Sequence, residues 1–104
     1  MMRAGPRVPP ESPHLTLYER KGCHLCAVAL LQLRSLQQTI PFFIDRVDIE
    51  GAEDLERRFM LEIPVVEVAG EIVGRGTIDL EAVRVAIIGA RLGNAGQLSP
   101  RDEG

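Results

Sequence analysis

The feature that most constrains the fold is a pair of cysteines, Cys23 and Cys26, placed between a strand-like run and a helix-like run. The strand-like run is Leu15-Thr16-Leu17-Tyr18, and a break at Lys21-Gly22 separates it from the cysteines. Apolar residues then recur at helical spacing, so Cys23 stands where a helix begins. This placement is more specific than the spacing alone, because zinc sites use the same spacing.

The bulk composition indicates one globular domain. The chain has 104 residues, of which 45% are hydrophobic, and a formal net charge of −3. This length supports one hydrophobic core and is too short for two. The mild acidity gives no support for binding nucleic acid or a membrane surface, and no stretch approaches the roughly 20 apolar residues of a membrane span. We expect a monomer with neither nucleic-acid nor membrane partners.

The periodic patterns fall within residues 14–92, where we expect the folded domain, between a loose leader at residues 1–13 and a loose tail at residues 93–104. The leader lacks the apolar core of a secretory signal, which favours a cytoplasmic location. In a reducing compartment, two cysteines at close spacing indicate catalysis or metal binding rather than a structural disulfide.

Hydrophobic periodicity and chain-breaking residues predict seven elements in the order β-α-β-α-β-β-α. Strands are expected at residues 15–20, 42–48 and 63–68 and from residue 72 onward, and helices at residues 23–38, 52–60 and 80–91. The first two strands are joined through a helix and should be parallel, whereas the last two are joined by a tight turn and should be antiparallel. This pattern predicts an α/β fold with a mixed four-stranded sheet flanked by helices on both faces.

The first helix should carry one apolar stripe, which we take as its core-facing side. Six residues at helical spacing form this stripe: Leu25, Val28, Ala29, Leu31, Leu33 and Leu36. After the fourth strand begins, the segment Gly74-Arg75-Gly76 is expected to lead the chain out of the sheet.

The spacing of the cysteines suits reversible disulfide chemistry. Residues three apart on a helix have Cβ atoms about 5–6 Å apart, and modest tightening brings two cysteines to disulfide distance. Unpaired backbone N–H groups and the helix dipole favour negative charge at the helix start, so Cys23 is predicted to be the thiolate nucleophile. Cys26, one turn further along, is predicted to be the resolving thiol.

Three charged or titratable residues lie close to the cysteines. His24 is a candidate for tuning the dithiol, since an imidazolium there would stabilise the thiolate, although it also fits an ordinary exposed position. Arg20 and Lys21 either favour an anionic partner or are simple surface charges.

With these features the chain resembles the glutaredoxin-like proteins of the thioredoxin superfamily. The resemblance runs from about residue 15 to residue 88 and includes the strand and dithiol, the run Val47-Asp48-Ile49, the segment Ile63-Pro64-Val65-Val66 and the glycines near residues 70–76. It implies a thioredoxin-like fold with a cis peptide bond before Pro64, close to the dithiol. It also implies that the backbone of Ile63 pairs with a bound thiol peptide.

The resemblance is weakest where glutathione would bind. Glutaredoxins end the last strand with a Gly-Gly pair followed by polar residues, and here the corresponding stretch is Arg75-Gly76-Thr77-Ile78. Gly76 and Thr77 at the start of the last helix are still candidates for binding a carboxylate. We therefore expect no tightly bound cofactor, and we keep glutathione as a candidate cosubstrate and electron donor, with a protein reductase as the other candidate donor.

Three functions remain open from the sequence. The first is a thiol-disulfide oxidoreductase acting on protein disulfides or glutathione mixed disulfides. The second is a metal-binding module in which Cys23 and Cys26 hold zinc, Cu(I) or a shared iron-sulfur cluster, although a closed zinc site needs four ligands. The third is a redox-inert member of the fold that binds a protein partner.

Overall fold

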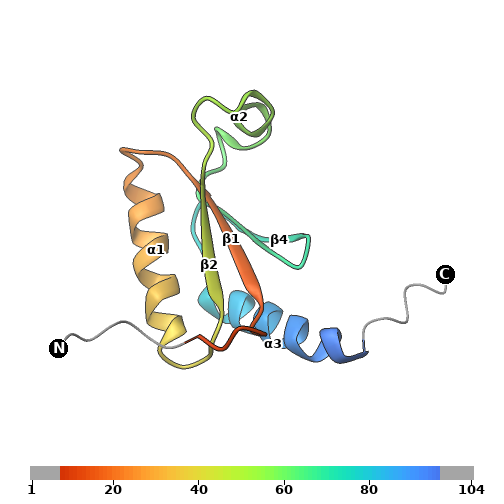
Figure 1. The fold of residues 1–104 in the computed structure, drawn as a ribbon. Coiled ribbons are helices and arrows are strands. Elements are labelled where there is room, and N and C mark those ends of the chain that lie inside the picture. Colours follow the sequence, from red (N-terminus) through yellow and green to blue (C-terminus); the bar gives the residue numbers. More distant parts are fainter. Residues whose placement is uncertain (1–7, 97–104) are drawn as a thin grey trace.

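A computed structural model describes residues 8–96 of the chain and shows the seven elements in the expected order (Figure 1). The strands are β1 (His14–Glu19), β2 (Phe43–Asp48), β3 (Val65–Val68) and β4 (Glu71–Arg75), and the helices are α1 (His24–Gln37), α2 (Glu53–Phe59) and α3 (Leu80–Gly96). Much of the predicted leader and tail, residues 1–7 and 97–104, lies outside the described residues. Among the described residues, no helix is long and apolar enough to cross a bilayer.

The four strands form one mixed sheet in the order β2-β1-β3-β4. Strands β1 and β2 are parallel and β3 and β4 are antiparallel, which confirms both predicted pairings. The central pair, β1 with β3, is antiparallel and places Tyr18 opposite Val65. The end of β1 therefore lies beside the start of β3, and this end of the sheet carries the cysteines.

Helices cover the two faces of the sheet unequally. Side chains of α1 and α3 pack on one face around Leu15, Leu17 and Val66, and these residues belong to the larger core cluster. The other face holds a smaller cluster, in which Phe59 of α2 packs with Val65. In Figure 1, α1 runs alongside β1 and β2, while α2 lies beyond the end of the strands at which α1 begins.

The predicted stripe of α1 is only partly buried. Its core-facing residues are Cys26, Ala29, Leu33 and Leu36. The other apolar residues point outward, with exposed fractions of 49% for Leu25, 37% for Val28 and 71% for Leu31. A helix lying on a sheet contacts it through one limited stripe, and the six residues at these spacings span more of the helix circumference than that stripe covers. The predicted apolar stripe is therefore wider than the side of the helix that faces the core.

Two further boundaries differ from the sequence prediction. Strand β4 includes Gly74 and Arg75, which pair with Val66 and Val65, so this segment does not leave the sheet before Gly76. A Cβ atom at Gly74 would lie 3.0 Å from Cδ1 of Ile78, which explains why a glycine fits this part of the strand. Helix α3 continues to Gly96 rather than ending near residue 91. A single glycine costs a helix only about 1 kcal/mol relative to alanine, so Gly93 alone does not end it.

Tyr18 connects β1 to β3 and to α2 on the smaller face of the sheet. The centroid of its ring lies 4.7 Å from the centroid of the Phe59 ring, and its hydroxyl donates a 2.6 Å hydrogen bond to Oε1 of Glu67. The hydrogen bond to this carboxylate, followed by burial, raises the pKa of Tyr18 above its ordinary value. Because the folded state holds the proton more tightly than the unfolded chain, this contribution to stability is present below the unfolded pKa and is lost as pH rises through the folded pKa.

We predict that Tyr18→Phe lowers the free energy of unfolding by about 1 kcal/mol near pH 7, the usual net contribution of one hydrogen bond. The ring contact with Phe59 is retained in this variant, so the loss reports the hydroxyl. The difference from the wild-type protein should shrink above about pH 10, where tyrosine ionises in the unfolded chain. Urea denaturation near pH 7 and above about pH 10 measures the free energy of unfolding of both proteins. An equal difference at the two pH values would contradict the hydrogen bond between Tyr18 and Glu67.

Candidate active site

A tight turn carries the chain from β1 into α1. The N–H of Cys23 donates to the carbonyl of Arg20 at 3.3 Å, which closes a four-residue turn. Gly22 occupies this turn with a φ of +80°, a conformation that side-chain-bearing residues rarely adopt. The break predicted at Lys21-Gly22 is thus a defined turn that delivers Cys23 to the start of the helix.

Cys23 caps the N-terminus of α1. Its backbone is extended, its carbonyl accepts the first helical hydrogen bond from Ala27 at 3.1 Å, and its Sγ accepts the N–H of Cys26 at 3.1 Å. This is the position and the hydrogen bond that serine or aspartate makes in an ordinary N-cap. The N–H group and the positive end of the helix dipole both favour negative charge on this sulfur. No acidic residue lies in the first turn to oppose them.

The two sulfurs form a disulfide, and their surroundings differ. The Cα atoms of Cys23 and Cys26 lie 5.2 Å apart. Cys23 is partly exposed, whereas Cys26 is 2% exposed and belongs to the core-facing stripe of α1 with Ala29 and Leu33. A reagent approaching from solvent therefore reaches Cys23 first.

A cavity of about 500 Å³ opens beside the disulfide. Residues of the turn, the first half of α1 and the end of β2 line it: Glu19, Arg20, Lys21, Gly22, Cys23, Cys26, Ala27, Leu30, Leu31, Arg46 and Asp48. Its walls are therefore apolar on the helix side and charged on the strand side. Arg20 and Lys21 are exposed and stand at this cavity, which places them where they can meet a bound molecule.

An ion pair between neighbouring strands forms part of the cavity wall. Nε of Arg46 lies 2.7 Å from Oε2 of Glu19, and the second guanidinium nitrogen lies 3.4 Å from Oε1. The hydrogen bond to Glu19, followed by its charge, raises the pKa of Arg46. The side chain of Glu19 is only 13% exposed, and it lies against the guanidinium group of Arg46. The sequence analysis does not predict this pair, because its members are 27 residues apart and meet only when their strands are neighbours.

The segment around Pro64 lies at the same end of the sheet as the dithiol. The Ile63–Pro64 peptide bond is cis, as the resemblance implies. The N–H of Gly76 donates to the carbonyl of Pro64 at 2.8 Å and to that of Glu62 at 2.9 Å, so the segment after β4 is tied to the segment before β3. An ion pair of 2.9 Å between Arg75 and Glu62 adds to this link. The structure thus brings two predicted site residues, Pro64 and Gly76, into direct contact.

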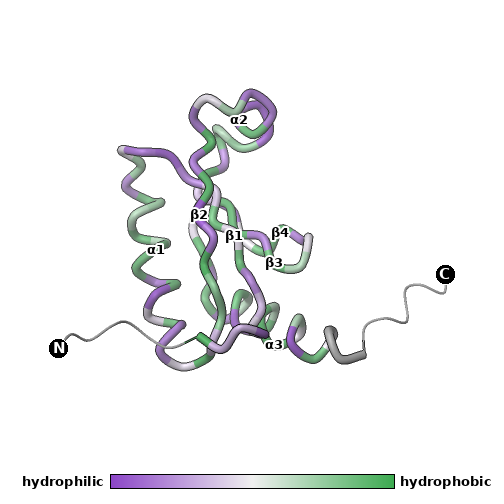
Figure 2. Tube along the Cα trace, in the orientation of Figure 1, coloured by the Kyte–Doolittle hydropathy of each residue, from purple (hydrophilic) through white to green (hydrophobic). Residues whose placement is uncertain are grey.

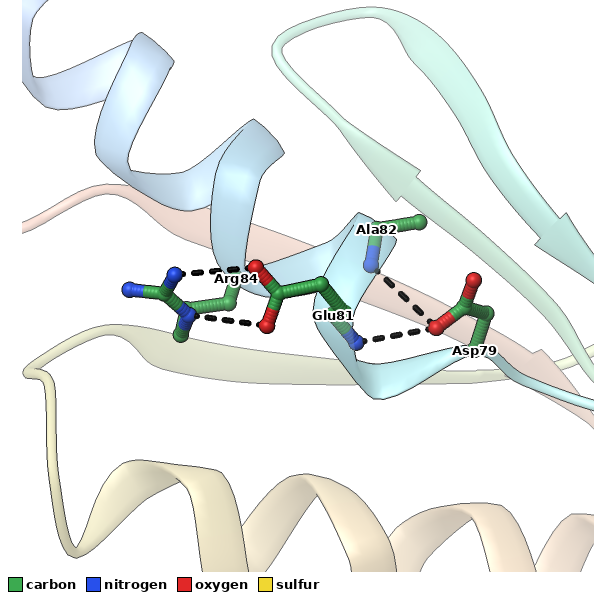
Figure 3. Close-up of polar contacts among 4 residues, drawn as sticks. All are labelled: Asp79, Glu81, Ala82 and Arg84. Atoms are coloured by element: carbon green, nitrogen blue, oxygen red, sulfur yellow. Dashed lines mark hydrogen bonds and ion pairs between the residues drawn. The ribbon is translucent and has the colours of Figure 1, made fainter.

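The start of α3 is capped by Asp79. Its Oδ1 accepts the N–H groups of Glu81 at 3.0 Å and of Ala82 at 3.4 Å, and Glu81 forms an ion pair with Arg84 one turn later (Figure 3). The hydrogen bond to Arg84 lowers the pKa of Glu81. Two N–H groups of this helix end are therefore already bound to a carboxylate of the chain itself. Thr77 is exposed two residues before this cap.

The remaining predicted residues fall into different surroundings. His24 is exposed at the first position of α1, and Ile63 packs against the smaller core cluster. Whether His24, Ile63 or Thr77 contacts a substrate stays a prediction.

Comparisons with a protein-family model and with solved structures agree with this architecture. A sequence profile of the glutaredoxin-like domain (DUF836) matches residues 14–93. The chain is 26% identical to protein Ne2328 from Nitrosomonas europaea, solved by NMR, with a TM-score of 0.68 over 78% of this chain and 98% of that one. It is 32% identical to the crystallised protein XcR50 from X. campestris, with a TM-score of 0.56 over 68% and 91% of the two chains. No curated protein matches the chain.

More distant structures share the fold alone. Oxidised mitochondrial thioredoxin 3 from Saccharomyces cerevisiae is 15% identical, with a TM-score of 0.53 over 76% of this chain and 79% of that one. This likeness is consistent with a thioredoxin-like fold, which the mixed sheet and three helices also display. The dithiol at the start of α1 fits a redox role. Together with the match over residues 14–93, these findings show that the chain belongs to the glutaredoxin-like domain family (DUF836).

Proposed function

We propose that the protein is a thiol-disulfide oxidoreductase that uses Cys23 as its nucleophile and Cys26 as its resolving thiol. The observation that carries the proposal is the inequality of the two cysteines. Cys23 is partly exposed and accepts a backbone N–H at a helix start, whereas Cys26 is buried in the core-facing stripe of the same helix. Only one of the two sulfurs is therefore placed to meet a partner.

The first step is attack by the Cys23 thiolate on one sulfur of the partner's disulfide. A bond forms between Sγ of Cys23 and that sulfur, the partner's S–S bond breaks, and the departing sulfur leaves as a thiolate that takes up a proton. The N–H of Cys26 and the helix dipole stabilise the thiolate of Cys23 before the attack. The product is a mixed disulfide between Cys23 and the partner.

The second step releases the partner. Cys26 loses its proton and attacks Sγ of Cys23, which forms the disulfide present in this structure and expels the partner's second sulfur as a thiol. Two electrons have then passed from the dithiol to the partner's disulfide. The Cα separation of 5.2 Å means that the backbone already holds the cysteines at a distance typical of disulfides.

The proposal also includes a class of substrates and an electron donor. Substrates are protein disulfides or mixed disulfides with glutathione, and glutathione or a protein reductase restores the dithiol. The link between Gly76 and Pro64 supports a substrate surface at this end of the sheet, with Ile63 and Thr77 at its margins. Asp79 already occupies N–H groups at the start of α3, so this helix end has less capacity to hold a glutathione carboxylate.

A metal-binding role receives less support from the surroundings of the dithiol. Within residues 8–96, no group of three or more histidine, cysteine, aspartate or glutamate side chains is arranged to hold a metal ion. A closed zinc site needs four ligands, so Cys23 and Cys26 would need two more from outside this part of the chain.

The two cysteines should give opposite results when each is replaced. Reduced Cys26→Ser should still attack a glutathionylated peptide and should accumulate as a mixed disulfide, because the resolving thiol is missing. Cys23→Ser should form no such adduct, since Cys26 is 2% exposed. Mass spectrometry of acid-quenched mixtures measures the adduct. Adduct formation by Cys23→Ser but not by Cys26→Ser would reverse the assignment.

His24 is predicted to make the dithiol more oxidising when its imidazole is charged. Removing a charge beside an exposed helix start changes the free energy by roughly 0.5 kcal/mol, which corresponds to about 10 mV for a two-electron couple. His24→Ala should therefore lower the reduction potential by about 10 mV. Equilibration with glutathione buffers measures the potential.

The other histidine of the chain provides the control for this measurement. His14 lies at the far end of β1, where its ring stacks on Phe43 and contacts Asp45. His14→Gln should leave the potential unchanged. An unchanged potential in His24→Ala would remove the tuning role.

A further inference from the structure

We propose that the disulfide substrate is a polypeptide segment with apolar and acidic residues next to its cysteine, and that this segment docks along the outer side of α1. The docking surface consists of Leu25, Val28 and Leu31 together with Arg20 and Lys21, and we call it the α1 outer face. The inference rests on the function proposed above and specifies its substrate class.

The apolar part of the α1 outer face begins at the dithiol. Leu25 lies between the two cysteines, and Val28 and Leu31 follow at intervals of three residues, with exposed fractions from 37% to 71%. The buried residues of α1 are others, namely Cys26, Ala29, Leu33 and Leu36. Figure 2 shows the hydrophilic turn before α1 leading into a largely hydrophobic first half of the helix.

The length of this stripe fits an extended chain better than a small thiol. Leu31 follows Leu25 by six positions, a distance of about 9 Å along the helix axis. An extended polypeptide covers that distance with about three residues, each rising about 3.3 Å. Of the three apolar residues, Leu31 is the one that lines the cavity beside the disulfide, together with Arg20 and Lys21, so a chain that leaves this cavity along α1 meets Leu31 first. Glutathione carries no apolar side chain that would use Val28 or Leu31.

The charges at the cavity favour an acidic partner. Arg20 and Lys21 are exposed there, and neither forms an ion pair with another residue within the described range 8–96. The carboxylates of the same cavity are already engaged: Glu19 binds Arg46, and Asp48 accepts the N–H of Glu50 at 2.9 Å. Helix α1 contains no acidic residue, although the whole chain carries a net charge of −3. A negatively charged segment therefore finds complementary charge beside Cys23.

The test compares three substrates under single-turnover conditions. Reduced protein is mixed with glutathionylated Leu-Glu-Cys-Leu-Glu, with glutathionylated Ser-Lys-Cys-Ser-Lys, or with glutathione disulfide, and the thiol released is measured after acid quenching. The acidic apolar peptide should react at least about 10-fold faster than the basic polar one at low salt, because burial and charge both favour it. Added salt should reduce that ratio.

Two variants locate the docking surface. Leu31→Ser should slow the acidic apolar peptide about fivefold, since it removes partly buried apolar contact. Arg20→Ser should slow it about threefold at low salt. With glutathione disulfide, Leu31→Ser should have a smaller effect, because glutathione has no apolar side chain to lose contact with, whereas Arg20→Ser should slow this anionic substrate as well. The matched controls are Val85→Ser, which replaces a 57% exposed valine of α3, and Arg91→Ser on the same helix, and both should react like the wild-type protein.

The outcomes separate the docking surface from the function beneath it. If the wild-type protein reduces all three substrates but treats the two peptides alike, or if Leu31→Ser leaves the acidic apolar peptide unaffected, docking on the α1 outer face is wrong and the oxidoreductase remains. If glutathione disulfide reacts faster than either peptide, the preferred substrate is a disulfide of glutathione and the polypeptide proposal is wrong. If reduced wild-type protein converts none of them, the proposed function and the docking surface both fail.

Discussion

The packing of one stripe of α1 against the sheet determines which of the two cysteines is buried. Ala29 and Leu33 lie against the face that carries Leu15 and Leu17, and this contact fixes the rotation of the helix about its axis. Successive residues of a helix are separated by about 100°, so a shift of one residue would carry Cys26 out of the core. The difference between a reachable sulfur and a protected one is therefore a consequence of core packing.

Strand β1 joins this packing to the rest of the site. It pairs with β2 on one side and with β3 on the other, so its final residues place the dithiol, Arg46 and the Pro64 segment at one end of the sheet. The N–H of Gly76 then holds the segment after β4 against Pro64. Residues separated by more than 50 positions along the chain, such as Cys23 and Gly76, therefore reach the same end of the sheet through strand pairing and backbone hydrogen bonds.

The sequence was sufficient for features that depend on local rules. The order of elements, the parallel and antiparallel pairings and the position of Cys23 at a helix start follow from periodicity, turn residues and connection rules. The outward side of α1 was not predictable, because apolar residues such as Val28 fit a buried or an exposed side equally well by spacing. The pairing of Arg46 with Glu19 depends on which strands are neighbours, which periodicity does not determine. The extent of β4 depends on the pairing of Gly74 and Arg75 with residues of β3, which local patterns do not determine.

The burial of Cys26 also affects how the protein responds to peroxides. In the mechanism proposed above, a peroxide entering from solvent meets the thiolate of Cys23 first and oxidises it to a sulfenic acid, the first and reversible stage of thiol oxidation. Cys26, one helical turn away, would condense with that group, release water and give the disulfide observed here. The irreversible sulfinic and sulfonic stages would then be avoided. An arrangement that suits exchange with a partner would thus also protect the reactive sulfur from permanent damage.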